Sequence, residues 1–302
     1  MTLIKYCLSF LVLLFINACA TVSDNSNSKE EVIAKNEKSL LWKIEGKGIK
    51  PSYIFGTMHL INAEYYNFST QLKRAIEKSD AVIVEVSEAP DPLAMFELLK
   101  LDSGTIAQFY TAEELAEVIQ YLNDNNVSTV VYEQVYSTMK PFLLLQAITQ
   151  SFFDGAPKSY DLDIMEYAKN NKVALVGLET YAQQIGFFDA ISNQAVADIC
   201  LESIRNHEKE KKSTVELMEL YANQKIDKLI PMLKKESPEI MDFEEIFLTQ
   251  RNLNWIPKLV DQFNKDKCFV AVGAAHLFDD NGILALLKKE GYQLTPILMK
   301  TD

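Results

Sequence analysis

The feature that most constrains this fold is a set of three short apolar runs, widely separated along the chain. The runs are AVIVEVS from Ala81, KVALVG from Lys172 and CFVAVG from Cys268. Each has the length of a strand and is apolar almost throughout, so we expect strands that are covered on both faces. Such strands are typical of parallel sheets that carry helices on either side.

Helical stretches connect these runs into two strand–helix–strand units. In the first, the strand SYIFGT follows LLWKIEG in a hairpin, and the helix NFSTQLKRAIEKSD leads into Ala81. In the second, the helix NGILALLKKEG follows the strand at Cys268 and leads into YQLTPIL. Parallel strands with right-handed crossovers are the expected result. The sequence therefore predicts an α/β fold with a central, mixed but largely parallel sheet flanked by helices; an α+β arrangement stays open.

Between the two units, helical patterns dominate. They fill residues 92–151 and 181–263, for example in TAEELAEVIQYLNDNN and FEEIFLTQRNLNWIPKLVDQF. Three prolines are expected to break the second stretch: Pro231, Pro238 and Pro257. We expect one domain over residues 40–302, with these helices as an insertion that forms a lobe or packs around the sheet.

Residues 1–18 have the pattern of an export signal. The apolar run from Cys7 to Ile16 is too short to span a membrane and has the length of a signal-peptide core. The run ends in INAC, which resembles the lipobox of bacterial lipoproteins. Cleavage before Cys19 would leave that cysteine to carry a lipid; cleavage at a neighbouring alanine, as in an ordinary signal peptide, is the alternative.

The lipoprotein hypothesis also predicts where the protein is located. Residues 19–39 include TVSDNSNSKEE, which lacks apolar periodicity, so we predict a flexible tether between lipid and domain. Ala20, and not aspartate, follows the cysteine. By resemblance to lipoprotein sorting in Gram-negative bacteria, this favours the outer membrane, with the protein facing the periplasm. We therefore expect a protein of the cell envelope that contacts the membrane through its lipid.

Charge and cysteine content narrow the possible partners. The net charge of −12 argues against nucleic acid, whose recognition requires clustered Lys and Arg. Besides Cys7 and Cys19, the chain contains only Cys200 and Cys268, which lack the short spacing of a structural zinc site. Cys268 lies in an apolar strand and is expected to be a buried thiol. A disulfide between it and Cys200 stays open.

Four side chains that can bind metals or transfer protons fall at or just after the predicted strand ends. They are His59, Glu85, Glu179 and His276. Ligands of open α/β sheets bind beyond the carboxyl ends of the strands, so we expect the four side chains to meet at one edge of the sheet. The third histidine, His207, lies in the charge-rich stretch IRNHEKEKKS and is expected to be solvated.

Two of these histidines occur in Gly-x-x-His motifs, Gly56 with His59 and Gly273 with His276. A glycine at this position allows a tight turn or a close approach of the backbone to a ligand. His59, His276 and Glu85 would together hold a divalent metal ion and leave one position open for water. This is the arrangement of hydrolytic metal centres.

Five segments resemble the TraB/GumN family, whose superfamily includes the Tiki metalloproteases. In order, they are LLWKIEG…SYIFGTMHL, SDAVIVEVS, VALVGLET, RN..W and CFVAVGAAHL…NGILALLKKEGYQLTPI, and together they span nearly the whole predicted domain. The resemblance implies that His59 and His276 are the family's two Gly-x-x-His histidines and that Glu85 is its strand-end glutamate. It also places Glu179 and Arg251 at the recurring Leu-Glu-Thr and Arg-Asn positions.

The chain departs from the family pattern at two places. Many relatives carry a glycine soon after the second histidine, where this chain has LFDD. The family often has an aspartate two residues after the strand-end glutamate, where this chain has Ser87. A metal site that depended on that aspartate would be weakened.

Likeness to Tiki relatives implies hydrolysis of peptide bonds with a divalent metal (Mn, Co or Zn). In that mechanism His59, His276 and a glutamate bind the ion. Glu85 or Glu179 ligates it or takes a proton from the attacking water, and Arg251 stabilises the oxyanion. We therefore expect a lipid-anchored metallohydrolase that acts on peptides or proteins. The alternatives are a non-enzymatic lipoprotein that binds haem, a peptide or a small molecule, and a metal-independent esterase, for which the chain lacks an evident nucleophile.

Overall fold

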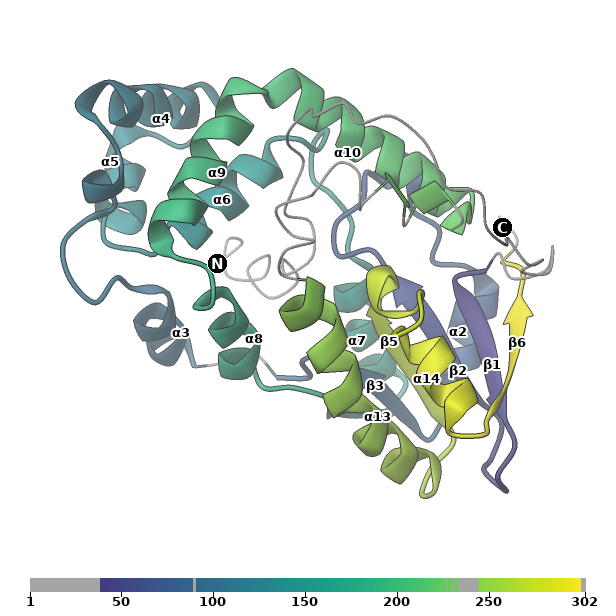
Figure 1. Ribbon diagram of the computed structural model, residues 1–302. Coiled ribbons are helices and arrows are strands. Elements are labelled where there is room, and N and C mark those ends of the chain that lie inside the picture. The colour runs from purple at the N-terminus through teal and green to yellow at the C-terminus, as the bar shows by residue number, and fades with distance from the viewer. Residues whose placement is uncertain (1–38, 89–90, 227, 230, 233–243, 300–302) are drawn as a thin grey trace, which may run out of the picture.

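The computed structural model describes residues 39–88, 91–226, 228–229, 231–232 and 244–299. The predicted signal peptide, the predicted lipidation site Cys19 and Pro238 lie outside these residues, as does the predicted tether except for its last residue. Figure 1 shows the described chain as a sheet with helices on its faces and a group of helices beside it.

The sheet has six strands in the order β4-β3-β5-β2-β1-β6. Their bounds are β1 (Leu41–Glu45), β2 (Ser52–Thr57), β3 (Ala81–Val84), β4 (Ala174–Gly177), β5 (Cys268–Gly273) and β6 (Gln293–Ile297). The first four strands in this order are parallel to one another, whereas β1 is antiparallel to both β2 and β6. The prediction of an α/β fold with a mixed, largely parallel sheet is confirmed.

The two strand–helix–strand units interleave within this sheet. β5 lies between β2 and β3 of the N-terminal unit, and β2 and β1 lie between β5 and β6 of the C-terminal unit. As a result β2 pairs directly with β5, and Thr57 stands opposite Gly273. The strands that precede His59 and His276 therefore end side by side, although they come from opposite ends of the sequence.

The expectation that all three apolar runs are covered on both faces is wrong for the run at Lys172. Every residue of β3 and β5 is buried, whereas β4 is partly exposed along its whole length. β4 is the edge strand of the sheet. It has a neighbouring strand on one side only, and helices that pack over the middle of a sheet cover its edge incompletely.

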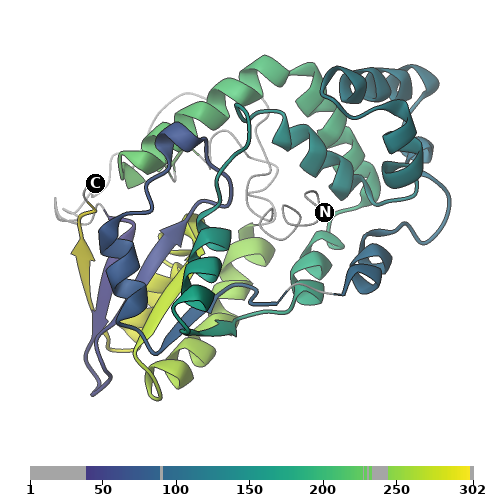
Figure 2. The same cartoon turned by 180° about the vertical axis from the view of Figure 1, so that it is seen from behind.

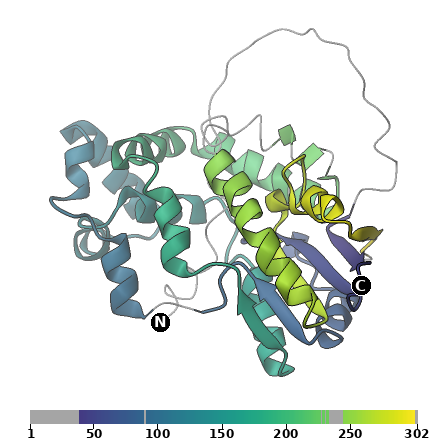
Figure 3. The same cartoon turned by 60° about the horizontal axis from the view of Figure 1, so that its bottom comes forward.

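Two pairs of helices cover the sheet, one pair on each face. α2 (Thr70–Glu77) and α7 (Tyr160–Asn170) cover the face seen in Figure 2. α13 (Gln250–Phe263) and α14 (Ile283–Lys289) cover the other face, which Figure 3 shows from below. Successive strand residues point to opposite faces. Phe55 and Phe269 thus join the core on the α7 side, and Ile54 and Val270 join the core on the α13 side.

The group of helices beside the sheet has an apolar core of its own. It contains α3 (Pro92–Leu99), α4 (Ala112–Asp124), α5 (Thr129–Val131), α6 (Pro141–Gln150), α8 (Tyr181–Phe188) and α9 (Asn193–Arg205). The short helices of the described chain, some in this group and some beside the sheet, are η1 (Ala63–Tyr65), η2 (Ile106–Phe109), η3 (Tyr132–Tyr136), η4 (Glu245–Thr249) and η5 (Ala274–His276). α4 begins with a capping box between Thr111 and Glu114, which satisfies backbone donors at the start of that helix.

α10 (His207–Ala222) joins the two parts of the molecule. Near its C-terminal end, Tyr221 donates a hydrogen bond of 2.7 Å to the backbone oxygen of Gly56 in β2. At its N-terminal end, His207 Nδ1 lies 2.6 Å from the hydroxyl of Tyr121 in α4, and its side chain is only 23% exposed. The expectation that His207 is solvated holds only in part, because its ring packs against Tyr121 and Phe152 of the helical group while part of the side chain stays exposed.

Pro257 does not break α13, contrary to expectation; it lies inside the helix. A proline removes the backbone donor that would bond to the carbonyl four residues earlier, here Leu253. Both residues lie on the exposed face of α13, where water can satisfy that carbonyl.

Cys200 and Cys268 are both free thiols, so they do not form a disulfide. Cys200 lies in the core of the helical group and Cys268 in the core beneath α13. Burial raises the pKa of Cys268 to about 12 and raises the pKa of Cys200 as well. Both are buried, protonated thiols, as predicted for Cys268.

Candidate functional site

The structure brings the four predicted strand-end residues together at the carboxyl edge of the parallel strands. Across this edge the order is Glu179 after β4, Glu85 after β3, His276 after β5 and His59 after β2. A Cβ atom built on Gly273 would lie 3.4 Å from Glu85 Oε1, 3.5 Å from His59 Nε2 and 3.6 Å from His276 Cδ2. Three of the four side chains thus border one small space in front of Gly273.

The glycines of the two Gly-x-x-His motifs have different roles. At Gly56, an added Cβ would lie 2.9 Å from Leu277 Cδ1 and 3.0 Å from Ala274 Cα. Gly56 therefore lets the turn that carries His276 pack directly on β2. At Gly273, an added Cβ would make only ordinary contacts, but it would fill the space in front of Glu85. Neither glycine has a positive φ, so a tight turn explains neither; close approach explains Gly56, and Gly273 leaves space among the site side chains.

Arg251, in the first turn of α13, lies at the centre of the site and is 1% exposed. Its Nη2 donates to Glu85 Oε2 at 2.6 Å, and its Nε and Nη2 donate to Glu179 at 3.0–3.2 Å. Its Nη1 donates to the backbone oxygen of Phe247 at 3.2 Å and faces His276 Nε2 at 3.1 Å. All five guanidinium N–H groups are engaged. In this arrangement Arg251 holds the carboxylates and has no N–H left for an oxyanion.

Asn252, the residue after Arg251, sets the tautomer of His276. Its side-chain oxygen lies 2.7 Å from His276 Nδ1, and its amide donates to the backbone oxygens of His276 and Asn281. An oxygen can only accept, so Nδ1 carries the proton and Nε2 accepts from Arg251. Burial and the Arg251 cation lower the pKa of His276 to about 3. The imidazole of His276 is therefore neutral.

His59 has the opposite environment. Its Nδ1 lies 2.8 Å from Asp161 Oδ2, and the other oxygen of Asp161 accepts a hydrogen bond of 2.8 Å from Thr57. Burial by itself would lower the pKa of His59, but Asp161, with help from Glu85, outweighs burial and raises it above the ordinary value. His59 Nε2 is buried and has no hydrogen-bond partner among the described residues.

The two glutamates of the site also differ. Burial alone would raise the pKa of Glu85, but the Arg251 guanidinium, helped by His59 and by the backbone N–H of Gly273, holds it well below the usual range. Gln184 from α8 donates a further hydrogen bond of 2.9 Å to Glu85. Burial raises the pKa of Glu179 even though Arg251 opposes the shift, and the indole of Trp255 donates to its Oε1 at 2.9 Å. Glu85 is thus the more firmly ionised carboxylate.

No sequence motif marks Asp161, Gln184 and Asn252, which also belong to the site. Each lies on a helix that packs against the site, not at a strand end. A signal was nevertheless present, because each residue occupies the buried stripe of its helix among apolar neighbours. The stripes are Asp161 with Ile164 and Ala168, Gln184 with Tyr181 and Ile185, and Asn252 with Trp255 and Leu259. A polar residue in an apolar stripe needs a buried partner.

The predicted metal ligands His59, His276 and Glu85 do not fit an ion in this arrangement. His59 Nε2, which has no partner among the residues that the structure describes, is what a ligand would offer, and Asp161 behind it resembles the carboxylates that orient metal-bound histidines. However, Nε2 of His276 accepts from Arg251, a cation that an ion would have to displace. In the part of the chain that the structure describes, no three His, Cys, Asp or Glu side chains are grouped closely enough to hold a metal.

Fold and site together define an α/β protein with a buried polar site at the carboxyl edge of a largely parallel sheet. The chain belongs to the TraB/PrgY/gumN family, whose model matches residues 40–296. It is similar to the "Uncharacterized protein YbaP" of Shigella flexneri, with 23% identity over 251 residues that cover 80% of this chain and 89% of the relative. No solved structure is significantly similar to it. The matched range contains every residue of the site.

Proposed function

We propose that this protein is a hydrolase in which His59 acts as the general base. The observation that carries the proposal is the state of His59 Nε2, which is buried, has no hydrogen-bond partner in the described part of the chain and borders the space in front of Gly273. Asp161 holds the other ring nitrogen at 2.8 Å. A histidine oriented by a carboxylate, with its second nitrogen at the border of this small space, resembles the arrangement used for general acid–base catalysis.

In the proposed reaction, His59 Nε2 takes a proton from a water molecule while the water oxygen attacks the substrate carbonyl. Asp161 and Glu85 stabilise the imidazolium that forms, consistent with the raised pKa of His59. The imidazolium then returns the proton to the leaving group as the carbonyl–heteroatom bond breaks. Arg251 keeps Glu85 ionised throughout. A peptide or protein substrate is proposed from the family resemblance.

The proposal is tested with purified protein, a peptide library and a panel of small esters. His59→Gln should lose turnover, and Asp161→Asn should reduce it by roughly 100- to 10,000-fold, the usual contribution of a positioned base. Assays with chelator, and with added manganese, cobalt or zinc, measure the metal requirement predicted from the resemblance. Asp163→Asn is the matched control, because its carboxylate bonds to Tyr66 instead of a histidine. Equal turnover by wild type and His59→Gln would rule out this role for His59.

A second candidate is a binding protein without catalytic activity. The observation in its favour is that Arg251, Glu85 and His276 form a buried network with their hydrogen bonds satisfied, as structural networks do. Haem is the natural probe, because His59 has a ring nitrogen that no described residue bonds to. A Soret shift that is lost in His59→Gln, in a protein with no turnover on peptides or esters, would favour this candidate.

We also propose that the protein is anchored by a lipid on Cys19 and faces the periplasm from the outer membrane. The support is the INAC sequence before the polar stretch, and Ala20 after the cysteine. Among the helices that the structure describes, none is long and apolar enough to cross a membrane.

A further inference from the structure

Arg251 occupies the centre of a set of acceptors that could otherwise bind a metal. Glu85, Glu179 and His276 are all side chains that ligate divalent ions, and each directs its acceptor atom at the guanidinium group. The separations are 2.6 Å to Glu85, 3.0 Å at the closest to Glu179 and 3.1 Å to His276. The three side chains therefore meet around a cation that belongs to the protein itself.

The guanidinium also explains why these acceptors do not form a metal-binding group. Oxygen and nitrogen ligands lie about 2.0–2.2 Å from a zinc ion. The arginine holds them farther apart, because they contact nitrogen atoms spread around a planar group. A cation at this position is required in either case, since Glu85 and Glu179 are buried and an uncompensated buried carboxylate is strongly unfavourable.

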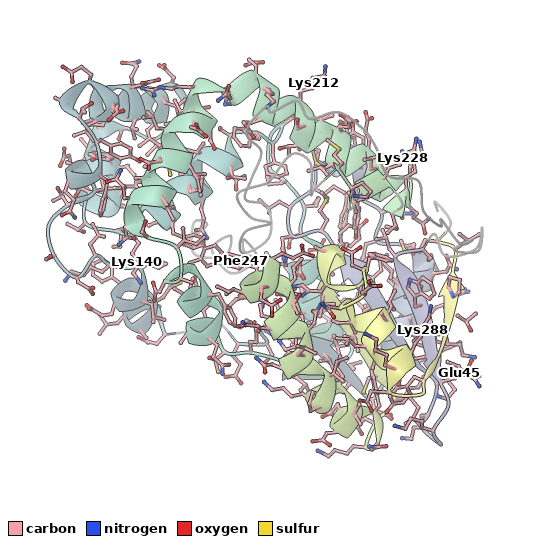
Figure 4. All side chains as sticks on the ribbon, viewed as in Figure 1. Glu45, Lys140, Lys212, Lys228, Phe247 and Lys288 are labelled. Atoms are coloured by element: carbon pink, nitrogen blue, oxygen red, sulfur yellow. The ribbon has the colours of Figure 1, made fainter. Side chains whose placement is uncertain are left out.

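Other contacts fix the arginine in place. Its guanidinium packs 4.7 Å from the centre of the Trp255 ring and 5.5 Å from that of Phe187. The backbone oxygen of Phe247, one turn earlier in the chain, accepts from Nη1. Figure 4 labels Phe247 at the boundary between the helical group and the sheet. Aromatic rings therefore pack against the guanidinium, and hydrogen-bond acceptors contact its N–H groups.

We propose that Arg251 takes the place of a divalent ion in this chain, so that the site operates with a permanent organic cation and no resident metal. The guanidinium performs the structural work of an ion: it holds Glu85 ionised, fixes Glu179 and occupies the lone pair of His276 Nε2. The inference concerns the same site as the proposed hydrolase. It is tested by binding, so it can stand or fall independently of turnover.

The experiment is a titration of purified, chelator-treated protein with Co²⁺, followed by its visible absorption and by calorimetry. Wild type should bind no ion at this site. Arg251→Ala should gain one Co²⁺ per chain, at least roughly 100-fold tighter than wild type, because a fixed positive charge has been removed from the ligand group. Arg251→Lys keeps the charge and should behave as wild type. Methylguanidinium should compete with Co²⁺ in Arg251→Ala, and His276→Gln added to that variant should abolish the gain.

The outcomes decide the proposal in either direction. A wild-type protein that binds one Co²⁺, with binding lost in His276→Gln, would show that an ion can displace the arginine, and the proposal would be wrong. A folded Arg251→Ala that gains no ion would overturn it as well. If Arg251→Ala does not fold by circular dichroism, the wild-type titration and its His276→Gln control still give the answer.

Discussion

At the residue scale, the two Gly-x-x-His histidines show how partners, and not motifs, set protonation. Both are buried at the same edge of one sheet. His59 faces the carboxylate of Asp161, and its pKa is raised; His276 faces the guanidinium of Arg251, and its pKa is lowered to about 3. The two histidines thus share a sequence motif but have opposite electrostatic environments. Only His59 retains a ring nitrogen that can take up a proton from outside the network.

Asp161→Asn should lower the pKa of His59. The carboxylate is what raises that pKa against burial, so its removal leaves burial as the dominant effect. An NMR titration of the His59 ring should show protonation at a lower pH than in wild type, whether or not a substrate is known. If the enzyme turns over, the acidic limb of its pH–rate profile should move to lower pH in the same variant.

Asp163→Asn provides the control for this titration, since it changes the same kind of residue on the same helix. The Asp163 carboxylate accepts from Tyr66, not from His59. The Asp163→Asn variant should therefore have the same His59 titration as wild type. An unchanged His59 titration in Asp161→Asn would show that the Asp161 contact does not control this ring.

His276 should make the protein less stable as pH falls from 7 to 5. Its folded pKa is about 3, and the unfolded chain has a value near 6.5. Between these two values the unfolded chain binds a proton that the folded chain does not, so the free energy of unfolding decreases. The expected loss from this group between pH 7 and 5 is roughly 2 kcal/mol.

Urea unfolding at several pH values measures this contribution. His276→Gln should lose roughly 2 kcal/mol less than wild type over that interval, whatever its absolute stability. His59→Gln should change the dependence in the opposite direction. The raised pKa of His59 contributes stability that is present below its unfolded pKa and is lost at higher pH. Parallel curves for wild type and His276→Gln would contradict the assignment.

At the scale of elements, strand ends were predictable and helix contacts were not. The apolar runs fix where the strands end, and parallel pairing then places Glu85, Glu179 and both histidines on one edge. Asp161 and Asn252 reach the same site from α7 and α13. Their rotation about the helix axis and the way those helices pack on the sheet depend on tertiary contacts. A polar residue in the apolar stripe of a helix indicates that it has a buried partner, but it does not show which residue that partner is.

The two motif glycines should respond differently to alanine. Gly56→Ala puts a Cβ 2.9 Å from Leu277 and 3.0 Å from Ala274, closer than ordinary contacts, and should destabilise the fold by about 1–3 kcal/mol. Gly273→Ala makes contacts of 3.4–3.6 Å on a backbone that alanine tolerates, so the stability should change little. The added methyl would nevertheless fill the space in front of His59 Nε2 and should reduce turnover or ligand binding.

Urea unfolding and an activity or haem-binding assay on the same two preparations separate these effects. Each variant adds one methyl group at the same place in a Gly-x-x-His motif, so each serves as the control for the other. Equal losses of stability in the two variants would mean that the site glycine is retained for packing, as Gly56 is.

At the scale of the whole molecule, the site depends on both parts of the structure. Phe247 packs in the core of the helical group, in ring contact with Phe188, and its carbonyl accepts from Arg251. Gln184 from the same group donates to Glu85. The helical insertion thus supplies partners to residues that the sheet positions. No local sequence pattern could predict that dependence, because it arises only when the two cores meet.

At this scale, the last prediction concerns how the protein is attached to the membrane and in which membrane it is located. Cys19→Ser should abolish lipid attachment, and the protein should then appear in the soluble periplasmic fraction, because the lipid is the proposed membrane anchor. Ala20→Asp should keep the lipid but move the protein from the outer to the inner membrane. Density-gradient fractionation and mass spectrometry of the N-terminal peptide measure both effects. Thermal unfolding of the released Cys19→Ser protein should match that of wild type in detergent, since every described strand and helix begins after the predicted tether. Membrane association that persists in Cys19→Ser, with no lipid on the peptide, would instead require an anchoring contact made by the domain itself.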